Sequence, residues 1–151
     1  MVKILHAADF HLDSPFAGLT SEQARARRRE GRENIARLAN YANAGYVDLV
    51  LLAGDLFDSG EIYRQTAETL AKALGTVEGR VFIAPGNHDY WDEKGPYAQV
   101  NWPENVHIFK SDALEAVELP ELNCVVHGAA FTAPECTDNL FGGFRAEEDG
   151  R

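Results

Sequence analysis

Three short apolar runs in the first ninety residues each end in polar side chains. They lie in VKILHAADFH (2–11), VDLVLLAGDLFD (47–58) and RVFIAPGNHD (80–89). Short runs rich in branched side chains and bounded by polar residues are typical of buried strands that lead into loops. The chain is therefore expected to form three such strands before residue 90.

Two segments of helical periodicity separate these strands. In residues 20–46, Thr20 and Gln23 form the pattern of a capping box and Gly45 is expected to end the helix. The apolar stripes of the two helices are Ile35, Leu38, Ala39 and Ala42 in the first, and Ala67, Leu70, Ala71 and Leu74 in the second. This alternation predicts an α/β fold with right-handed βαβ units on a largely parallel sheet, whose sites gather beyond the carboxyl ends of the strands.

The pattern changes after Tyr90. NVHIF (105–109), LEAVEL (114–119) and NCVVHGAAF (123–131) predict short strands of a second, more antiparallel sheet. Residues 131–151 are rich in glycine, proline and acids and show no periodicity. We expect a single domain over residues 1–151, in which 1–90 form a βαβαβ half and 91–151 begin the second sheet and end in an irregular tail.

Composition and charge narrow the class of protein. The chain is 45% hydrophobic and 25% charged, as globular domains are, and no apolar run approaches ~18 residues, so neither a membrane span nor a signal peptide is predicted. Cys124 and Cys136 lack C-x-x-C spacing, which fits a reducing compartment, so the cytoplasm is the expected location. The net charge of −10 repels nucleic acid and anionic membranes at long range. Six arginines interrupt this acidity and either contact phosphates or form a solvated helix face: Arg25, Arg27, Arg28, Arg29, Arg32 and Arg37.

Each of the three predicted strands ends in side chains that can bind a metal or transfer a proton. They are Asp9 and His11 after the first strand, Asp55 and Asp58 after the second, and Asn87 and His88 after the third. Neighbouring parallel strands would bring them to one edge of the sheet. Carboxylate, imidazole and amide oxygen form a mixed ligand set that suits manganese, iron or zinc better than calcium.

The spacing of these residues adds local expectations. An extended D-x-H segment points Asp9 and His11 to one face, because strand side chains alternate with a period of two. Gly54 and Gly86 permit tight backbone turns at the ends of the second and third strands. Taken singly, such residues serve equally well as caps, turn residues or loop histidines. Three aligned strand ends favour a shared site.

The motifs DFH, GDLFD and GNHD resemble the signature of calcineurin-like metallophosphoesterases, and HAADFHLDSPF resembles the opening of SbcD-type DNA-repair exonucleases. The match covers roughly residues 2–109 in motif order and spacing. It implies a sandwich of mixed sheets flanked by helices. Phosphoprotein phosphatases carry arginine and glycine after the second aspartate of the middle motif, whereas Ser59 and Gly60 stand there in this chain, which weakens a phosphatase assignment.

The resemblance also implies a ligand set. Asp9 and His11 would hold the first of two divalent metal ions, Asp55 would bridge both ions, and Asn87 would reach the second. Manganese is the metal that the resemblance implies, with iron and zinc as alternatives.

Two further residues receive catalytic roles by the same resemblance. His88 would protonate the leaving oxygen or stabilise the transition state, and Asp58 would orient His88. Asp89 is expected to be a structural turn residue.

Later histidines complete the site in that family, one at the end of a further strand and then a G-H-x-H pair, which this sequence lacks. His127 remains open as a ligand or a residue of a second-sheet strand, which fits its segment better. His6 and His107 are expected to be structural, and His107 to lack partners. We therefore expect the N-terminal portion of a longer protein, truncated at its C-terminus and weak or inactive as a hydrolase by itself.

The function implied by the resemblance is a manganese-dependent DNA nuclease domain of the SbcD type, which hydrolyses phosphodiester bonds by a two-metal mechanism. DNA and an SbcC-like ATPase would be its partners. Self-association as a homodimer is expected from a partly uncovered second sheet. Two alternatives stay open: another metallophosphoesterase, acting on a phosphomonoester, a cyclic nucleotide or a lipid pyrophosphate, and a non-catalytic binding module.

Overall fold

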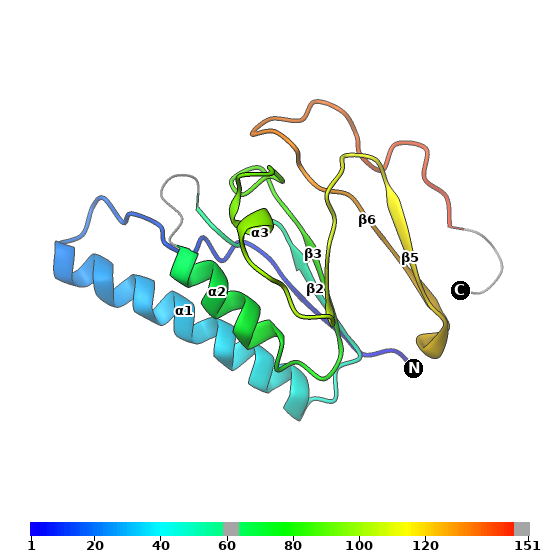
Figure 1. Cartoon of the computed structure of the whole chain (residues 1–151), viewed down its shortest axis with the longest axis horizontal. Coiled ribbons are helices and arrows are strands. Elements are labelled where there is room, and N and C mark those ends of the chain that lie inside the picture. The colour runs from blue at the N-terminus through cyan, green and yellow to red at the C-terminus, as the bar shows by residue number, and fades with distance from the viewer. Residues whose placement is uncertain (59–63, 147–151) are drawn as a thin grey trace.

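A parallel sheet lies between a layer of helices and a β-hairpin in the computed structural model, which describes residues 1–58 and 64–146 (Figure 1). The sheet has the order β1 (Ile4–Ala7), β2 (Leu49–Ala53), β3 (Arg80–Ala84), β4 (Val106–Ile108). The other elements are α1 (Ser21–Ala44), α2 (Arg64–Leu74), α3 (Pro96–Gln99), the 3-10 helix η1 (Pro120–Leu122), and the antiparallel strands β5 (Glu115–Leu119) and β6 (Cys124–Gly128). The α/β class with mixed sheets flanked by helices is confirmed.

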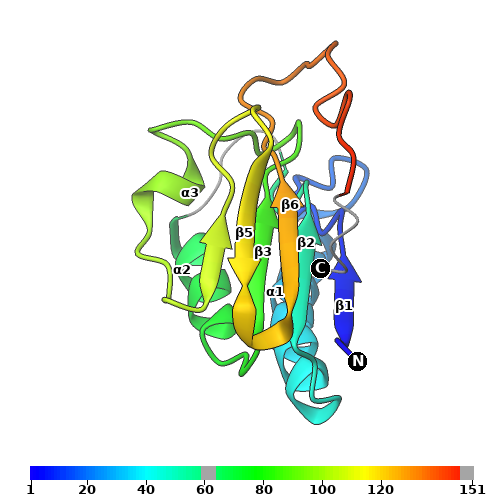
Figure 2. The same cartoon turned by 90° about the vertical axis from the view of Figure 1, so that its right-hand side faces the viewer.

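The central strands are apolar almost without interruption because both faces of the sheet are covered. Val50 and Val81 pack in the cluster beneath α1 and α2, whereas Leu49 and Phe82 pack in the cluster beneath the hairpin. Strands buried on both faces lose the polar alternation of half-exposed strands. Figure 2 shows the hairpin in front of β2 and β3, with β1 beside it. Ile4 on β1, which shares the hairpin-side face with Leu49, is accordingly 55% exposed.

Both predicted helices are confirmed. The Gln23 amide donates to Thr20 Oγ1 at 3.3 Å and the Thr20 amide donates to Gln23 Oε1 at 3.0 Å, so the capping box of α1 is present. The helix ends at Ala44, with Gly45 as its cap. The predicted stripe of α2 is buried, and α2 ends at Leu74.

The strand predicted in NVHIF is present, but the sheet predicted for it was wrong. β4 pairs in parallel with β3, with Val106 opposite Val81, and so extends the first sheet instead of joining the second. The connection between β3 and β4, residues 85–105, has α3 as its helix, which is only four residues long, so the long helical period that marks a parallel crossover is absent from the sequence. The other two segments form the predicted antiparallel pair.

The arginines of α1 have partners on the helix and beside it. Arg27 and Arg29 pair with glutamates of the same helix. Arg28 donates to backbone carbonyls of the loop that follows β1, and Arg32 Nη2 lies 2.5 Å from Asp13 Oδ1 in that loop. The helix face is therefore partly a solvated surface and partly an anchor for the loop.

Three remaining expectations concern the whole chain. No helix among the described residues is long and apolar enough to cross a membrane. Both cysteines are free thiols. The tail has no helix or strand over 129–146, as its composition predicts, while residues 147–151 lie outside the described part, as do Ser59 and Gly60 of the middle motif.

Candidate metal centre

The loops that leave β1 and β2 continue side by side beyond the ends of the strands. The His11 amide donates to the Asp55 carbonyl at 3.0 Å, the Leu12 amide to the Leu56 carbonyl at 2.9 Å, and the Asp58 amide to the Leu12 carbonyl at 3.0 Å. The predicted convergence of strand ends is thus continued by a parallel ladder between the loops. This ladder brings the first two motifs into contact.

Asp9 and His11 do not lie in an extended segment, so that prediction was wrong. Their φ angles are 57° and 44°, in the left-handed region that non-glycine residues rarely adopt. His11 Nε2 nevertheless lies 3.8 Å from Asp9 Oδ1. The side chains of Asp9 and His11 therefore approach each other because both residues are left-handed, and not because strand side chains alternate. Backbone hydrogen bonds stabilise this conformation, such as that from the Asp9 amide to the Gly54 carbonyl at 3.1 Å.

Two glycines allow the loops after β2 and β3 to touch. Gly54 has a φ of 82°, and a Cβ atom on it would lie 3.1 Å from the Cα of Gly86. A Cβ atom on Gly86 would lie 2.3 Å from Asp55 Oδ1, which is a clash. The approach of these two corners therefore requires the absence of both side chains.

Asp9, His11 and Asp55 form one group of potential metal ligands. One donor atom from each lies within 4.8 Å of the other two. Asp9 is exposed, while His11 and Asp55 are partly buried, and Asp55 Oδ1 also accepts from the His88 amide at 3.0 Å. Two carboxylates and an imidazole this close together are a donor set that fits a divalent transition metal.

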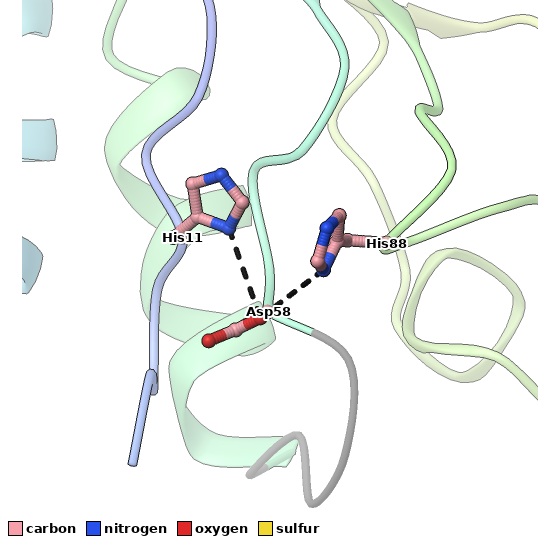
Figure 3. Close-up of side chains that lie close together, drawn as sticks. All are labelled: His11, Asp58 and His88. Atoms are coloured by element: carbon pink, nitrogen blue, oxygen red, sulfur yellow. Dashed lines mark ion pairs between the residues drawn. The ribbon is translucent and has the colours of Figure 1, made fainter. Parts of the chain in front are cut away.

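His11, Asp58 and His88 form a second group (Figure 3). Asp58 Oδ1 lies 3.7 Å from His11 Nδ1 and 3.2 Å from His88 Nδ1, between two rings whose centroids are 5.0 Å apart. A carboxylate in this place can pair with either imidazole when that ring is protonated, and so favours its present orientation. The contact of Asp58 with His11 was not expected from the sequence, and it makes His11 common to both groups.

Three further residues were considered from the sequence: Asn87, His127 and His107. Asn87 is exposed and directly precedes His88. His127 is a residue of β6 whose ring lies 4.5 Å from that of Phe144. His107 has a partner, contrary to expectation, because its Nε2 lies 3.0 Å from Glu115 Oε1.

Asp89 contributes more than the predicted turn residue would. It is buried, at 2% exposure, and its carboxylate accepts hydrogen bonds from the loop after β2 and from the loop after β3. The donors are the amides of Asp55, Leu56, Phe57 and Gly86, and the Tyr97 hydroxyl. Burial, and then the charge of Asp89, raise the pKa of Tyr97 well above its usual value of 10. The sequence signal for this role was the position of Asp89 directly after Asn87 and His88. The burial of its side chain could not be predicted from the motif.

The family model for calcineurin-like phosphoesterases matches residues 2–147. The chain belongs to this family. Calcineurin-like phosphoesterases are hydrolases that generally bind two divalent metal ions, and the two donor groups described above are candidate ligand clusters for such ions. The expected family is confirmed.

Three curated relatives are similar to parts of this chain. The uncharacterized metallophosphoesterase YhaO of Bacillus subtilis (strain 168) is 38% identical over 113 residues, which are 71% of this chain and 27% of YhaO. The SbcD component of the nuclease SbcCD is 33% identical in Rhodobacter capsulatus, over 58% of this chain and 22% of the relative. The same component in Bacillus subtilis is 22% identical, over 78% and 30%. The chain spans less than a third of each relative.

Proposed function

We propose that this chain carries the metal-binding part of a manganese-dependent nuclease of the SbcD type, which hydrolyses phosphodiester bonds in DNA. The observation that carries the proposal is the convergence of Asp9, His11 and Asp55 at the carboxyl edge of the parallel sheet. Two of the three relatives above are components of the nuclease SbcCD, which supports DNA as the substrate and an SbcC-like ATPase as the partner.

In this proposal Asp9 and His11 would hold one cation, Asp55 would be shared between two, and Asn87 would hold the second. Two Mn²⁺ ions, or Fe or Zn in their place, would polarise the phosphoryl oxygens and activate a water molecule near neutral pH. Asp55 suits the shared position because a carboxylate has about four lone-pair directions, and its bond from the His88 amide occupies one.

His88 is proposed to donate a proton to the leaving oxygen, with Asp58 as its positioning residue. With Nδ1 of His88 facing Asp58, the opposite nitrogen, Nε2, is the atom that exchanges a proton with the substrate. The His88 side chain is 38% exposed, so a substrate can reach it. Asp58 also stabilises the charged imidazole before the proton leaves.

The two cation positions differ in the number of ligands that this proposal assigns to them. Asp9, His11 and Asp55 are available to the first, whereas only Asp55 and Asn87 are proposed for the second, because Asp58 and His88 receive other roles. We therefore expect this chain to bind one Mn²⁺ weakly and to hydrolyse phosphodiesters slowly.

A second candidate is a metallophosphoesterase with a different substrate: a phosphomonoester, a cyclic nucleotide or a lipid pyrophosphate. The higher identity to YhaO than to either nuclease component favours it, as does the net charge of −10, which opposes contact with nucleic acid. A binding module without catalysis is the remaining alternative.

The substrate class can be tested with two measurements at saturating Mn²⁺. Hydrolysis of bis(p-nitrophenyl) phosphate should exceed hydrolysis of p-nitrophenyl phosphate, because the proposed site acts on diesters. The fluorescence anisotropy of a labelled single-stranded oligonucleotide should rise when the unmodified chain is added in the presence of Mn²⁺ but not in its absence. With Asp55→Asn it should not rise under either condition. A preference for the monoester, or oligonucleotide binding that is indifferent to Mn²⁺ and to Asp55, would contradict the nuclease assignment.

A further inference from the structure

A buried tyrosine behind the candidate metal centre contacts the loops after β2 and β3, which carry Asp55 and Asn87. Tyr97 lies on α3 and is 2% exposed. Its ring meets that of Phe57 edge-on, with centroids 5.5 Å apart, and its hydroxyl donates to Asp89 Oδ2 at 2.5 Å. Phe57 lies between Asp55 and Asp58 in the loop after β2, whereas Asp89 lies in the loop after β3.

The Asp89 carboxylate connects Tyr97 to the backbone of Asp55 through hydrogen bonds. Asp89 Oδ1 accepts from the amides of Asp55 at 3.1 Å and Gly86 at 2.7 Å, while Oδ2 accepts from the amides of Leu56 at 2.8 Å and Phe57 at 3.2 Å. Hydrogen bonds to an ionised acceptor are stronger than neutral ones. They fix the backbone of Asp55, which has an unfavourable φ of 53°. A rotation of the Asp89 carboxylate would therefore displace Asp55.

The Tyr97 hydroxyl limits that rotation. The other hydrogen bonds that the described residues donate to Asp89 come from backbone amides of the loops after β2 and β3. The Tyr97 hydroxyl is a side-chain donor and belongs to α3. Both residues are 2% exposed, so water does not readily replace the hydroxyl. Trp102 fixes the position of the tyrosine in turn, because its Nε1 donates to the Tyr97 carbonyl at 2.9 Å and its ring lies 5.8 Å from that of Tyr97.

We propose that Tyr97 is a positioning residue of the metal centre. Through Asp89 it fixes the backbone of Asp55, and thereby the carboxylate that would be shared between two cations. The inference rests on the proposed function in one respect, which is that Asp55 binds a metal ion. Tyr97 lies outside the three sequence motifs, and its contribution comes from the packing of α3 against both loops.

The substitution Tyr97→Phe removes the hydroxyl and keeps the ring beside Phe57. We expect the Kd for Mn²⁺, measured by titration calorimetry, to rise about tenfold, because groups behind metal ligands typically change metal affinity by about 10- to 100-fold. The visible absorption spectrum of bound Co²⁺ should also change, since it reports ligand geometry.

Two control variants separate positioning from stability. Tyr46→Phe removes a hydroxyl from a side chain that is 76% exposed. Val77→Ala opens a cavity in the core in the turn between α2 and β3, which lies at the amino end of β3, whereas the motif loops follow the carboxyl ends of the strands. Both controls should bind Mn²⁺ and Co²⁺ as the unmodified chain does, although Val77→Ala should be less stable.

The outcomes distinguish this inference from the proposed function. Unchanged Mn²⁺ affinity and Co²⁺ spectrum in Tyr97→Phe, or an equal loss of affinity in Val77→Ala, would overturn the inference and leave the proposed function standing. No Mn²⁺ binding by the unmodified chain would overturn both. If Tyr97→Phe does not fold, hydrogen exchange on the unmodified chain decides: Mn²⁺ should slow exchange at the amides of Asp55, Leu56 and Phe57, and unchanged exchange there would overturn the inference.

Discussion

At the scale of single residues, the two histidines of the centre differ in their neighbours. His11 lies between Asp9 and Asp58 and belongs to both donor groups, whereas His88 shares only the second. A ligand and a proton donor have different requirements, because a ligand must face the metal and a donor must face the substrate. This asymmetry agrees with the different roles that the family resemblance implies for two rings whose centroids lie 5.0 Å apart.

The first prediction compares His11→Gln with His88→Gln. His11→Gln should weaken Mn²⁺ binding at least about tenfold, because it removes a proposed ligand. His88→Gln should leave Mn²⁺ affinity within about twofold while lowering the hydrolysis rate by ~10² to 10⁴, the usual contribution of a general acid. Titration calorimetry and the diester assay check both. Equal losses of metal in the two variants would make His88 a ligand.

The second prediction concerns alkaline pH. Burial and Asp89 raise the pKa of Tyr97 in the folded chain above 10, its usual value in an unfolded chain. Above pH 10 the folded chain therefore retains the Tyr97 proton while the unfolded chain loses it. The contribution of Tyr97 to the free energy of unfolding is complete below about pH 10 and declines as the pH rises further. In urea unfolding at several pH values, the unmodified chain should lose stability above pH 10 more steeply than Tyr97→Phe. Parallel curves would contradict this.

At the scale of elements, the loop after β1 depends on its neighbours. Asp9, His11 and Asp13 all have positive φ, a conformation that costs roughly 1–3 kcal/mol at a non-glycine residue. The ladder to the loop after β2 offsets part of this cost. Arg32 of α1 supplies a second anchor through Asp13, whose side chain is 1% exposed.

The third prediction compares Arg32→Met with Arg29→Met. Arg32→Met should lower the free energy of unfolding by about 1–3 kcal/mol, because it removes the guanidinium that pairs with the buried Asp13 carboxylate. It should also weaken Mn²⁺ binding, since the same loop carries His11. Arg29 pairs with Glu33 on the exposed helix surface, so its substitution should change stability by less than about 0.5 kcal/mol. Urea unfolding and calorimetry provide the comparison, and equal effects would argue against the anchor.

Elements were predictable from the sequence where a period or a cap defines them. The capping box and the buried stripe of α1 follow directly from side-chain spacing, as do β2 and β3 from their apolar runs. β4 was assigned to the wrong sheet because three residues carry no information about their pairing partner. The left-handed φ of His11 was missed because histidine, although enriched in that region relative to most residues, adopts it too rarely for residue type to predict it.

At the scale of the whole molecule, the parallel sheet brings three motifs that are distant in the sequence to one candidate metal centre. Its central strands are buried on both faces, by the helices and by the hairpin, so their carboxyl ends are fixed relative to one another. The motif order allowed the convergence of Asp9 and Asp55 to be predicted. The burial of Asp89 and the contribution of Tyr97 could not be, because they arise only when α3 packs against both loops.

The central claim is that Asp9, His11 and Asp55 together bind a divalent cation at this edge of the sheet. Titration of the unmodified chain and of Asp55→Asn with Mn²⁺ in a calorimeter tests it most directly. The account predicts one weak site in the unmodified chain and at least about a tenfold loss of affinity in the variant, because the carboxylate proposed to be shared is replaced by a neutral amide. An unmodified chain that binds no Mn²⁺, or a variant that binds it equally well, would contradict the account.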